Sequence, residues 1–386
     1  MNNQNEAVLV AYGRTPLTRA FKGGLAQTHP VEYGSVALKG VLEKVPQLDV
    51  STIEDVIVGC AVMERYTSYN IARLVAQKAG LPDVVPAQSI NRFCSSGLQA
   101  IATAANAIEA GQMDVVVAGG VEMMTGMSMG HPEAFHDQEL AARIPATYLS
   151  MGETAEIVAQ RYDLRREEME VMAVESHQKA AAAQAAGKFD EEIIPVTVKG
   201  ENGSVILTRD EGIRPATTAK KLAELDPCFR PDGRITAATS SQMTDGASFV
   251  VLMSRQRAQT LGCQPIARYV SFAVSGVPAE IMGIGPVAAV PKALEKAGLT
   301  VADLDVIELN EAFASQAMAC MRALGLPKDK VNPNGGAMAL GHPMGATGTV
   351  LTCKAISELK RTGGHSGLIT MCVGGGMGAA GVLVMT

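Results

Sequence analysis

The chain has 386 residues, of which 47% are hydrophobic and 19% are charged, so a disordered chain is excluded. This length accommodates two or three core units. The formal net charge of −6 provides no basic footprint, and no nucleic-acid partner is expected.

The seven cysteines lie at least 19 residues apart along the chain. This spacing excludes a C-x-x-C clamp and argues against the disulfide framework of a secreted protein. The first residues, which include Asn2 to Glu6, show neither the basic nor the apolar segment of a signal peptide. We therefore expect a cytoplasmic protein in a reducing environment.

The first half of the chain alternates helical and strand patterns. Residues 37–43 are typical of a helix and residues 55–60 of a strand, and a small-residue helix over 95–110 precedes a strand over 114–120 that ends in glycines. Cys94 lies directly before the helix at 95–110. The positive end of a helix lowers a thiol pKa, so this position suits a nucleophile. A buried structural cysteine is the alternative.

Residues 122–241 differ in composition, because charged and alanine-rich stretches crowd together there. We interpret this region as an inserted loop or lid domain that also touches a substrate. The apolar strand over 247–253 is then expected to return to the first half. The predicted halves are residues 1–121 with 242–265, and residues 266–386.

The second half repeats the pattern of the first. A helix over 292–298 leads to a strand over 305–309, and a helix over 345–359 leads to a strand over 368–372. Strands that alternate with helices indicate βαβ units and a largely parallel sheet in each half. The sequence therefore predicts an α/β protein built from two similar units.

Several polar residues of the second half suit a reactive site. His342 lies in a loop rich in glycine and proline, where it either meets a substrate or anchors the loop. Asn310 and Glu311 follow one predicted strand, and Cys372 ends another, just before glycines that can form an oxyanion hole. Capping of the strand ends is the alternative for these residues.

Two features of the last residues invite other interpretations. The 25 residues after Arg361 carry no Asp, Glu, Lys or Arg, which is long enough for a membrane anchor, but eight of them are glycine. Two buried strands, 367–371 and 379–385, fit better. A G-x-G-x-x-G match at 376–381 is followed by only five residues, so no dinucleotide unit fits. Zinc-ligand spacing is absent from the sequence, and no metal is expected.

Four segments together resemble the signature blocks of the thiolase family. They are Asn91-Arg-Phe-Cys-Ser-Ser-Gly97, Asn310-Glu-Ala-Phe-Ala314, Gly341-His-Pro-Met-Gly-Ala-Thr-Gly348 and Cys372-Val-Gly-Gly-Gly-Met-Gly378. Their order and spacing are comparable to those of the family, and the resemblance extends over essentially the whole chain. It implies a duplicated βαβαβαββ core in five αβαβα layers, with a loop domain inserted in the first half.

The resemblance also implies an activity and residue roles. Thiolases cleave 3-ketoacyl-CoA with CoA to acetyl-CoA and a shortened acyl-CoA, or run the reverse condensation. By position, Cys94 resembles the nucleophile, His342 the base that activates it and binds the thioester oxygen, and Cys372 the acid/base. Asn310 resembles the residue that holds a water in one oxyanion hole. The N–H groups of Cys94 and Gly374 correspond to the other hole.

Coenzyme A is expected as a co-substrate, with no tightly bound cofactor. The resemblance places Arg214 near its adenine or phosphate and Ser241 near its pantetheine. Phe229, Met151 and Met282 correspond to the lining of the acyl and pantetheine region. Ordinary packing is the alternative for all five residues.

One departure from the family pattern concerns the substrate. Acetoacetyl-specific thiolases carry a histidine before the Met-Gly that matches Met151-Gly152, and this chain has Ser150 there. The resemblance therefore favours the degradative 3-ketoacyl-CoA branch, in fatty-acid β-oxidation, over a biosynthetic acetoacetyl-CoA thiolase. A condensing ketosynthase and a silent acyl-CoA-binding protein are further alternatives. Expected partners are a second or further copies, as a homodimer or homotetramer, and a hydratase–dehydrogenase subunit.

Overall fold

A computed structural model describes residues 3–127, 133–200 and 203–386. Its main feature is one large sheet with the strand order β10-β11-β12-β9-β1-β8-β5-β3-β4, with β2 paired beside β8. The strands of the first half are β1 (Ala7–Arg14), β2 (Thr18–Arg19), β3 (Asp55–Gly59), β4 (Ala87–Ile90), β5 (Val115–Met123) and β8 (Thr244–Ser254). Those of the second half are β9 (Ala267–Gly276), β10 (Val306–Leu309), β11 (Ser366–Val373) and β12 (Met377–Met385). A separate ribbon consists of β6 (Val196–Gly200) and β7 (Gly203–Leu207).

The expectation of a largely parallel sheet is wrong. In the large sheet only the outer pairs, β3–β4, β3–β5 and β10–β11, are parallel. The other pairs are antiparallel. One reason is the short connection between β11 and β12, which consists of residues 374–376. A connection of this length can link only antiparallel neighbours.

The uncharged tail forms this β11–β12 hairpin, so the predicted pair of buried strands is confirmed and the membrane anchor is wrong. Both strands are buried over most of their length. Among the described residues, no helix is both long and apolar enough to cross a membrane.

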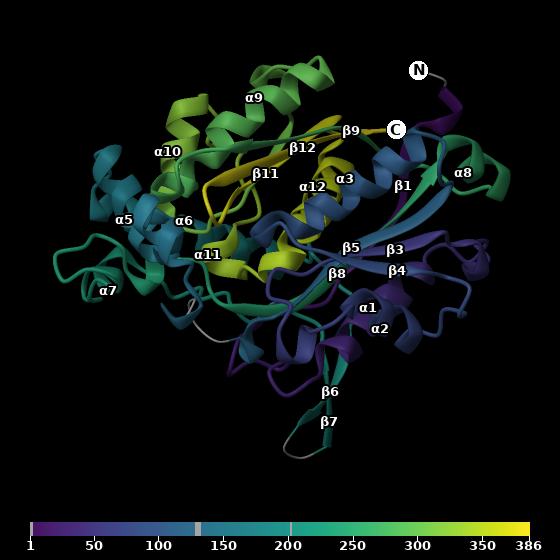
Figure 1. The fold of residues 1–386 in the computed structure, drawn as a ribbon, viewed down its shortest axis with the longest axis horizontal. Coiled ribbons are helices and arrows are strands. Elements are labelled where there is room, and N and C mark those ends of the chain that lie inside the picture. The colour runs from purple at the N-terminus through teal and green to yellow at the C-terminus, as the bar shows by residue number, and fades with distance from the viewer. Residues whose placement is uncertain (1–2, 128–132, 201–202) are drawn as a thin grey trace.

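The helices lie in three layers around the sheet (Figure 1). The central layer is α3 (Ser96–Glu109) with α12 (Met344–Thr362), which pack against each other and against strands of both halves. On the outer face of the first half lie α1 (Pro30–Leu42) and α2 (Ile71–Lys78). On the outer face of the second half lie α9 (Gly285–Ala297) and α10 (Ala314–Leu324). Five layers, αβαβα, result.

The chain order repeats the unit βαβαβαββ. The first half runs β1-α1-β3-α2-β4-α3-β5 and closes with β8, which pairs with β1 and β5 as expected for the strand over 247–253. The second half follows the same order from β9 to β12. Its counterpart of β4 is reduced to one parallel bridge between Ile307 and Val331.

The chain between β5 and β8 carries the remaining helices and the β6–β7 ribbon. Its helices are α4 (Gln138–Arg143), α5 (Met151–Arg161), α6 (Arg166–Ala185) and α7 (Ala219–Ala223). Short helices elsewhere are α8 (Arg255–Leu261) and α11 (Ala337–Leu340). The bounds 122–241 for an inserted domain stay a prediction, and β5 itself continues to Met123.

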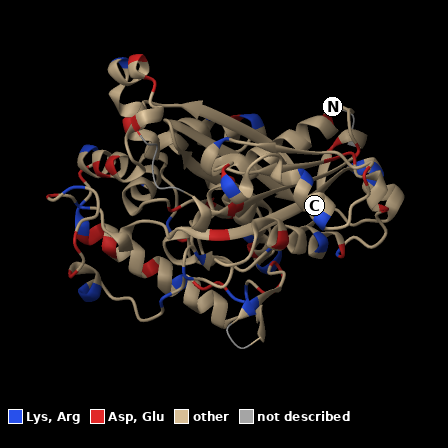
Figure 2. Cartoon of the chain, turned by 60° about the horizontal axis from the view of Figure 1, so that its bottom comes forward, with Lys and Arg blue, Asp and Glu red and all other residues tan. Residues whose placement is uncertain are grey.

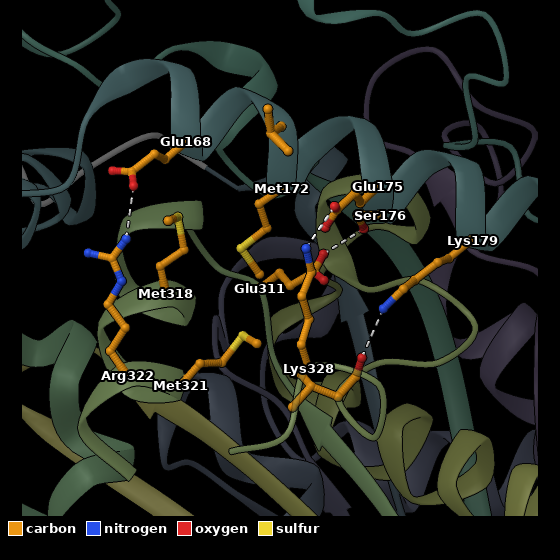
Figure 3. A pocket seen from close by; sticks show the side chains of 12 residues that line it. Glu168, Met172, Glu175, Ser176, Lys179, Glu311, Met318, Met321, Arg322 and Lys328 are labelled. Atoms are coloured by element: carbon orange, nitrogen blue, oxygen red, sulfur yellow. Dashed lines mark hydrogen bonds and ion pairs between the residues drawn. The ribbon is translucent and has the colours of Figure 1, made fainter. Parts of the chain in front are cut away.

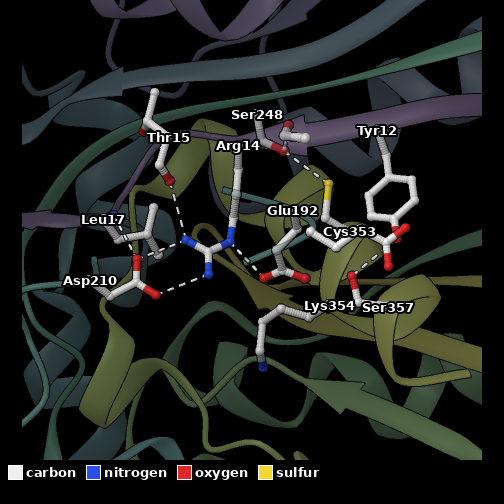
Figure 4. A network of polar contacts seen from close by, with 12 residues as sticks. Tyr12, Arg14, Thr15, Leu17, Glu192, Asp210, Ser248, Cys353, Lys354 and Ser357 are labelled. Atoms are coloured by element: carbon white, nitrogen blue, oxygen red, sulfur yellow. Dashed lines mark hydrogen bonds and ion pairs between the residues drawn. The ribbon is translucent and has the colours of Figure 1, made fainter. Parts of the chain in front are cut away.

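A buried ionic network attaches this segment to the sheet (Figure 4). Arg14, the last residue of β1, is fully buried and forms a two-pronged contact with Asp210, at 2.7 and 2.9 Å. Its Nε also donates to Glu192 at 2.8 Å. One guanidinium therefore joins the sheet to two places in the segment.

The charged residues carry both signs side by side (Figure 2). In this view acidic and basic residues are interspersed along the outer helices and loops, whereas the strands are mostly tan. This interspersed distribution differs from the single-sign stripe of a nucleic-acid interface.

Candidate active site

Cys94 lies in a short 3-10 turn, Phe93–Ser95, between β4 and α3. Phe93 has a positive φ of 44°, so the turn needs support from its neighbours. Asn91 gives that support, because its side-chain oxygen accepts the Phe93 N–H at 2.7 Å. Ser96 closes the turn, accepting the Arg92 N–H at 2.9 Å. Hydrogen bonds from both sides therefore fix the turn that carries Cys94.

The Cys94 sulfur lies beside two backbone N–H groups, its own and that of Gly374. These are the two groups that the family resemblance assigns to an oxyanion hole. Burial nevertheless raises the pKa of the Cys94 thiol to about 11, against the lowering effect of both N–H groups. The expectation of a lowered pKa is therefore wrong for this state, since desolvation outweighs the helix end.

Cys372 lies on β11 and reaches the same place from the second half. Its side chain is completely buried. Burial raises the pKa of the Cys372 thiol well above its ordinary value, and charge on Cys94 raises it further. A neutral thiol at this position can donate a proton to a developing carbanion.

His342 and Asn310, two further predicted site residues, lie beside each other. The Asn310 side-chain nitrogen lies 3.4 Å from His342 Nε2, and Thr347 Oγ1 lies 2.6 Å from His342 Nδ1. The same amide nitrogen lies 3.5 Å from Nδ1, so the donor and acceptor roles of the ring nitrogens depend on the tautomer; in the tautomer whose Nδ1–H donates to Thr347, Nε2 is the acceptor. Burial lowers the pKa of His342 to about 4, so the ring is neutral at pH 7 and can take a proton.

The loop before α12 and the loop before β8 fix the position of His342. Its N–H donates to the carbonyl of Gln242 and to Thr244 Oγ1, at 3.1 Å each. Asn310 is held through its N–H, which donates to the Thr370 carbonyl at 2.9 Å. The buried Asn310 Oδ1 accepts no hydrogen bond from the described residues. An acceptor of this kind suits a site that a polar ligand or water enters.

Three predicted lining residues lie around these groups. Met151, at the start of α5, is 37% exposed, and its sulfur lies 3.5 Å from where a Cβ on Gly374 would be. Phe229 is 38% exposed and meets Phe313 edge-on, with ring centroids 6.1 Å apart. Met282 is buried in the same apolar cluster as Cys372 and Phe313. All three side chains therefore lie against residues of the second half, namely Gly374, Phe313 and Cys372.

Arg214 and Ser241 lie further out. The Arg214 side chain is exposed and donates to Gln242 Oε1 at 3.2 Å. The Ser241 N–H donates to the Ala312 carbonyl at 2.9 Å. Ser241 and Gln242 thus run between the segment after Asn310 and His342, on the approach to the site.

Two contributors were missed by the reasoning from sequence. Thr347 holds the His342 ring through its hydroxyl. The sequence places Thr347 in the segment 341–348 but gives no sign of this contact. Glu122 is a buried carboxylate that accepts the N–H groups of Ala61, after β3, and of Gly345, in the first turn of α12. A single acidic residue at the end of a strand gives no sequence signal for that position.

A separate cavity of about 180 Å³ lies between α6 and α10 (Figure 3). Three methionines, Met172, Met318 and Met321, line it, and ion pairs such as Arg322–Glu168 form its rim. Among its described lining residues, Glu311 alone belongs to the predicted signature blocks, and its carboxylate accepts from Ser176 at 2.7 Å. Glu311 therefore anchors α6. In the described part of the chain, no group of three His, Cys, Asp or Glu side chains could hold a metal ion.

Comparisons with known proteins point to one family. The family description "Thiolase, N-terminal domain" matches residues 7–256, and "Thiolase, C-terminal domain" matches residues 263–385. The chain is 48% identical over 386 residues to the 3-ketoacyl-CoA thiolase of Bacillus subtilis (strain 168), which covers 98% of each chain. It is 45% identical over 383 residues to the peroxisomal 3-ketoacyl-CoA thiolase A of Mus musculus, covering 97% of this chain and 90% of the other.

A solved structure shows the same fold. The crystal structure of the Bacillus anthracis acetyl-CoA acetyltransferase matches with a TM-score of 0.93 and 39% sequence identity, covering 100% of both chains. The two family descriptions together span nearly the whole sequence. The chain therefore belongs to the thiolase family.

Proposed function

We propose that this protein is a 3-ketoacyl-CoA thiolase, an acetyl-CoA C-acyltransferase in which Cys94 carries the acyl group. One observation supports the catalytic roles of these residues. Cys94, from the first half, lies close to Cys372 and to the Gly374 N–H, from the second half. Relatives named 3-ketoacyl-CoA thiolase, at 45% and 48% identity, support the substrate class.

The first half-reaction cleaves the carbon–carbon bond. Neutral His342 takes the proton of Cys94 as the sulfur attacks the 3-keto carbon. The N–H groups of Cys94 and Gly374 stabilise the resulting oxyanion, and each such donor contributes about 2.7–4 kcal/mol. The bond between C2 and C3 then breaks, and Cys372 gives its proton to C2 of the departing acetyl-CoA enolate. Protonated His342, with a water held by Asn310, stabilises the enolate oxygen.

The second half-reaction restores the enzyme. The Cys372 thiolate takes the proton of the incoming CoA thiol, whose sulfur attacks the acyl-Cys94 thioester. The shortened acyl-CoA leaves, and Cys94 regains its proton from His342. An acyl-cysteine is a thioester like the substrate, so the transfer is nearly balanced in both directions.

The decisive test of the nucleophile is Cys94→Ala. This variant should lose CoA-dependent cleavage of 3-ketoacyl-CoA, while the unchanged protein forms a covalent acyl adduct on Cys94 that intact-mass spectrometry detects after mixing with substrate. Cys372→Ala serves as a comparison, because it should retain the ability to carry an acyl group on Cys94. Cleavage that persists in Cys94→Ala would contradict the assignment.

The degradative direction rests on Ser150. This residue caps α5 and accepts the Glu153 N–H, in a reciprocal capping box. A serine there leaves the space beside Met151 without the histidine of acetoacetyl-specific relatives. A series of 3-ketoacyl-CoA substrates of increasing length, measured in both directions, separates this proposal from the biosynthetic acetoacetyl-CoA alternative. Activity confined to acetoacetyl-CoA would favour the alternative.

We also propose that the protein works as a homodimer or homotetramer in the cytoplasm, and that it associates with a hydratase–dehydrogenase subunit. All seven cysteines are free, which suits a reducing compartment. Light scattering of the purified chain, alone and mixed with such a subunit, tests the assembly. A monomer at micromolar concentration would contradict it.

A further inference from the structure

Glu122 is a buried carboxylate that none of the catalytic roles above uses. It lies on β5, and its side chain is completely shielded from solvent. One oxygen accepts the N–H of Ala61 at 2.8 Å and that of Gly345 at 2.7 Å. The other accepts the Val62 N–H at 3.3 Å and lies 3.6 Å from the Cys60 sulfur. The carboxylate therefore ties together three separate segments of chain.

One connection from Glu122 leads to the nucleophile. Ala61, held by the carboxylate, accepts a hydrogen bond on its carbonyl from the Asn91 side chain at 2.8 Å. The oxygen of the same Asn91 amide accepts the Phe93 N–H at 2.7 Å. Phe93 immediately precedes Cys94 and holds the strained φ of the turn. The carboxylate thus supports the turn through two hydrogen bonds in series.

A second connection leads to the base. Gly345 lies in the first turn of α12, three residues after His342, and that turn also carries Thr347, whose Oγ1 lies 2.6 Å from His342 Nδ1. The start of α12 lies very close to β5. A Cβ on Gly345 would be 2.8 Å from the Glu122 carboxylate, and a Cβ on Gly120 would be 2.3 Å from the Gly345 carbonyl oxygen. The glycines allow β5 to approach α12 closely enough for the bond to form.

Glu122 does not suit a role as a reacting group. It forms no ion pair with the described residues, and its oxygens are occupied by backbone N–H groups of fixed loops. The Tyr33 hydroxyl holds the Glu122 backbone in turn, donating to its carbonyl at 2.7 Å. A buried, anchored carboxylate that binds the start of α12 directly and the Cys94 turn through Ala61 and Asn91 can hold the two at one separation.

We propose that Glu122 is a positioning residue that aligns the His342 ring with the Cys94 thiol. The proposal rests on the proposed function, in which proton transfer between these two groups starts the reaction. Small misplacements matter at this step, because an error of about 1 Å in such a pair costs about 100-fold in rate.

A double-mutant cycle on Cys94 alkylation tests the alignment without any substrate. In the unchanged protein, His342→Ala should slow iodoacetamide modification of Cys94 by about 100-fold at pH 7, which is the contribution of a positioned base. In a Glu122→Gln background, the same His342 change should slow it less than about tenfold, because the pair is no longer aligned. Equal effects in both backgrounds, or no effect of His342→Ala in either, would overturn the proposal.

Steady-state kinetics give a second readout. Glu122→Gln should lower kcat about 100-fold and change KM less than about threefold, because the acyl-CoA surface is untouched. Glu156→Gln is the matched control: Glu156 is also a buried carboxylate that accepts backbone N–H groups, from Arg234 and Ile235, but on α5. It should keep kcat. Equal losses of kcat in the two variants would point to general destabilisation and overturn the specific role.

Asn91→Ala keeps the proposal testable if Glu122→Gln does not fold. The Asn91 side chain is exposed, so its removal spares the core. It breaks the connection to Cys94 alone, and the same alkylation cycle with His342→Ala should again lose most of its coupling. Unreduced coupling would contradict the proposal. Failure of the unchanged protein to cleave any 3-ketoacyl-CoA would refute the proposed function, whereas the alkylation cycle would still decide the role of Glu122.

Discussion

At the scale of single residues, burial leaves the two proposed reacting groups, Cys94 and His342, uncharged at pH 7. Burial raises the pKa of Cys94 to about 11 and lowers that of His342 to about 4. Between these values both groups are uncharged, so little thiolate exists at pH 7. In the proposed mechanism the proton therefore moves as the sulfur attacks, and the neutral imidazole of His342 accepts it.

This arrangement predicts an unusual pH dependence. His342 stays neutral above pH 4 and Cys94 stays protonated below pH 11, so alkylation of Cys94 by iodoacetamide should be nearly constant between pH 6 and 8. In His342→Ala the reagent must await preformed thiolate, and the rate should rise about tenfold per pH unit. Stopped samples quantified by mass spectrometry give both profiles. If the alkylation rate of the unchanged protein instead had a titration midpoint between pH 6 and 8, Cys94 would be partly ionised to the thiolate at pH 7.

At the scale of elements, the central helices α3 and α12 pack through glycine. A Cβ on Gly348 would lie 2.3 Å from the Leu98 nitrogen, and one on Gly97 would lie 2.8 Å from the Gly345 carbonyl. The two helix backbones thus approach where a side chain would keep them apart. Glycine at these two positions therefore allows the close packing of the two helices.

Gly348→Ala should therefore destabilise the protein, although alanine favours a helix over glycine by about 1 kcal/mol. The added methyl group meets backbone atoms that cannot rotate away, and overpacking of this kind costs about 1–3 kcal/mol. The displaced α12 should also lower kcat through Thr347 and His342. Urea unfolding and steady-state kinetics measure both effects.

The control for this prediction is Gly276→Ala. A Cβ on Gly276 would meet only the Gly376 carbonyl, at 3.9 Å, which is an ordinary contact. That variant should unfold within about 0.5 kcal/mol of the unchanged protein. If Gly348→Ala were as stable as this control, the tight helix contact would be wrong.

Local patterns were sufficient to predict most elements but not their assembly. Residues 95–110 and the tail hairpin were expected and occur as α3 and as β11 with β12. Apart from this hairpin, the antiparallel pairs were not expected, because the direction of a strand such as β8 depends on how a distant part of the chain enters the sheet. Burial is also a property of the assembled fold, so the raised thiol pKa of Cys94 and the position of Glu122 were beyond reach of the sequence.

At the scale of the whole molecule, few backbone hydrogen bonds join the sheet of the first half to that of the second. The two halves of the sheet meet through β1 and β9, where the register pairs only Val8 with Arg268 and Leu9 with Ala267. The central helices and buried polar contacts supply the rest. Among these contacts, the Ser357 hydroxyl on α12 donates to the Tyr12 hydroxyl on β1 at 3.3 Å, and both residues are buried.

Arg14 is the corresponding contact for the segment between β5 and β8, and its loss should be costly. Arg14→Gln leaves Glu192 and Asp210 buried without their cation, and breaking such a pair costs about 3–5 kcal/mol. Asp210 also accepts the Leu17 N–H at 2.7 Å, so the damage should reach the chain after β1.

Two measurements check this prediction. Denaturant unfolding should reveal the loss of stability, and hydrogen exchange should speed up around Leu17 and residues 189–200 before the central helices are affected. Arg73→Gln is the control, because its partner Asp83 is exposed to solvent and such pairs contribute less than about 1 kcal/mol. Equal stability of the two variants would show that the buried network only fills space, since neither carboxylate would then depend on the guanidinium for its place in the core.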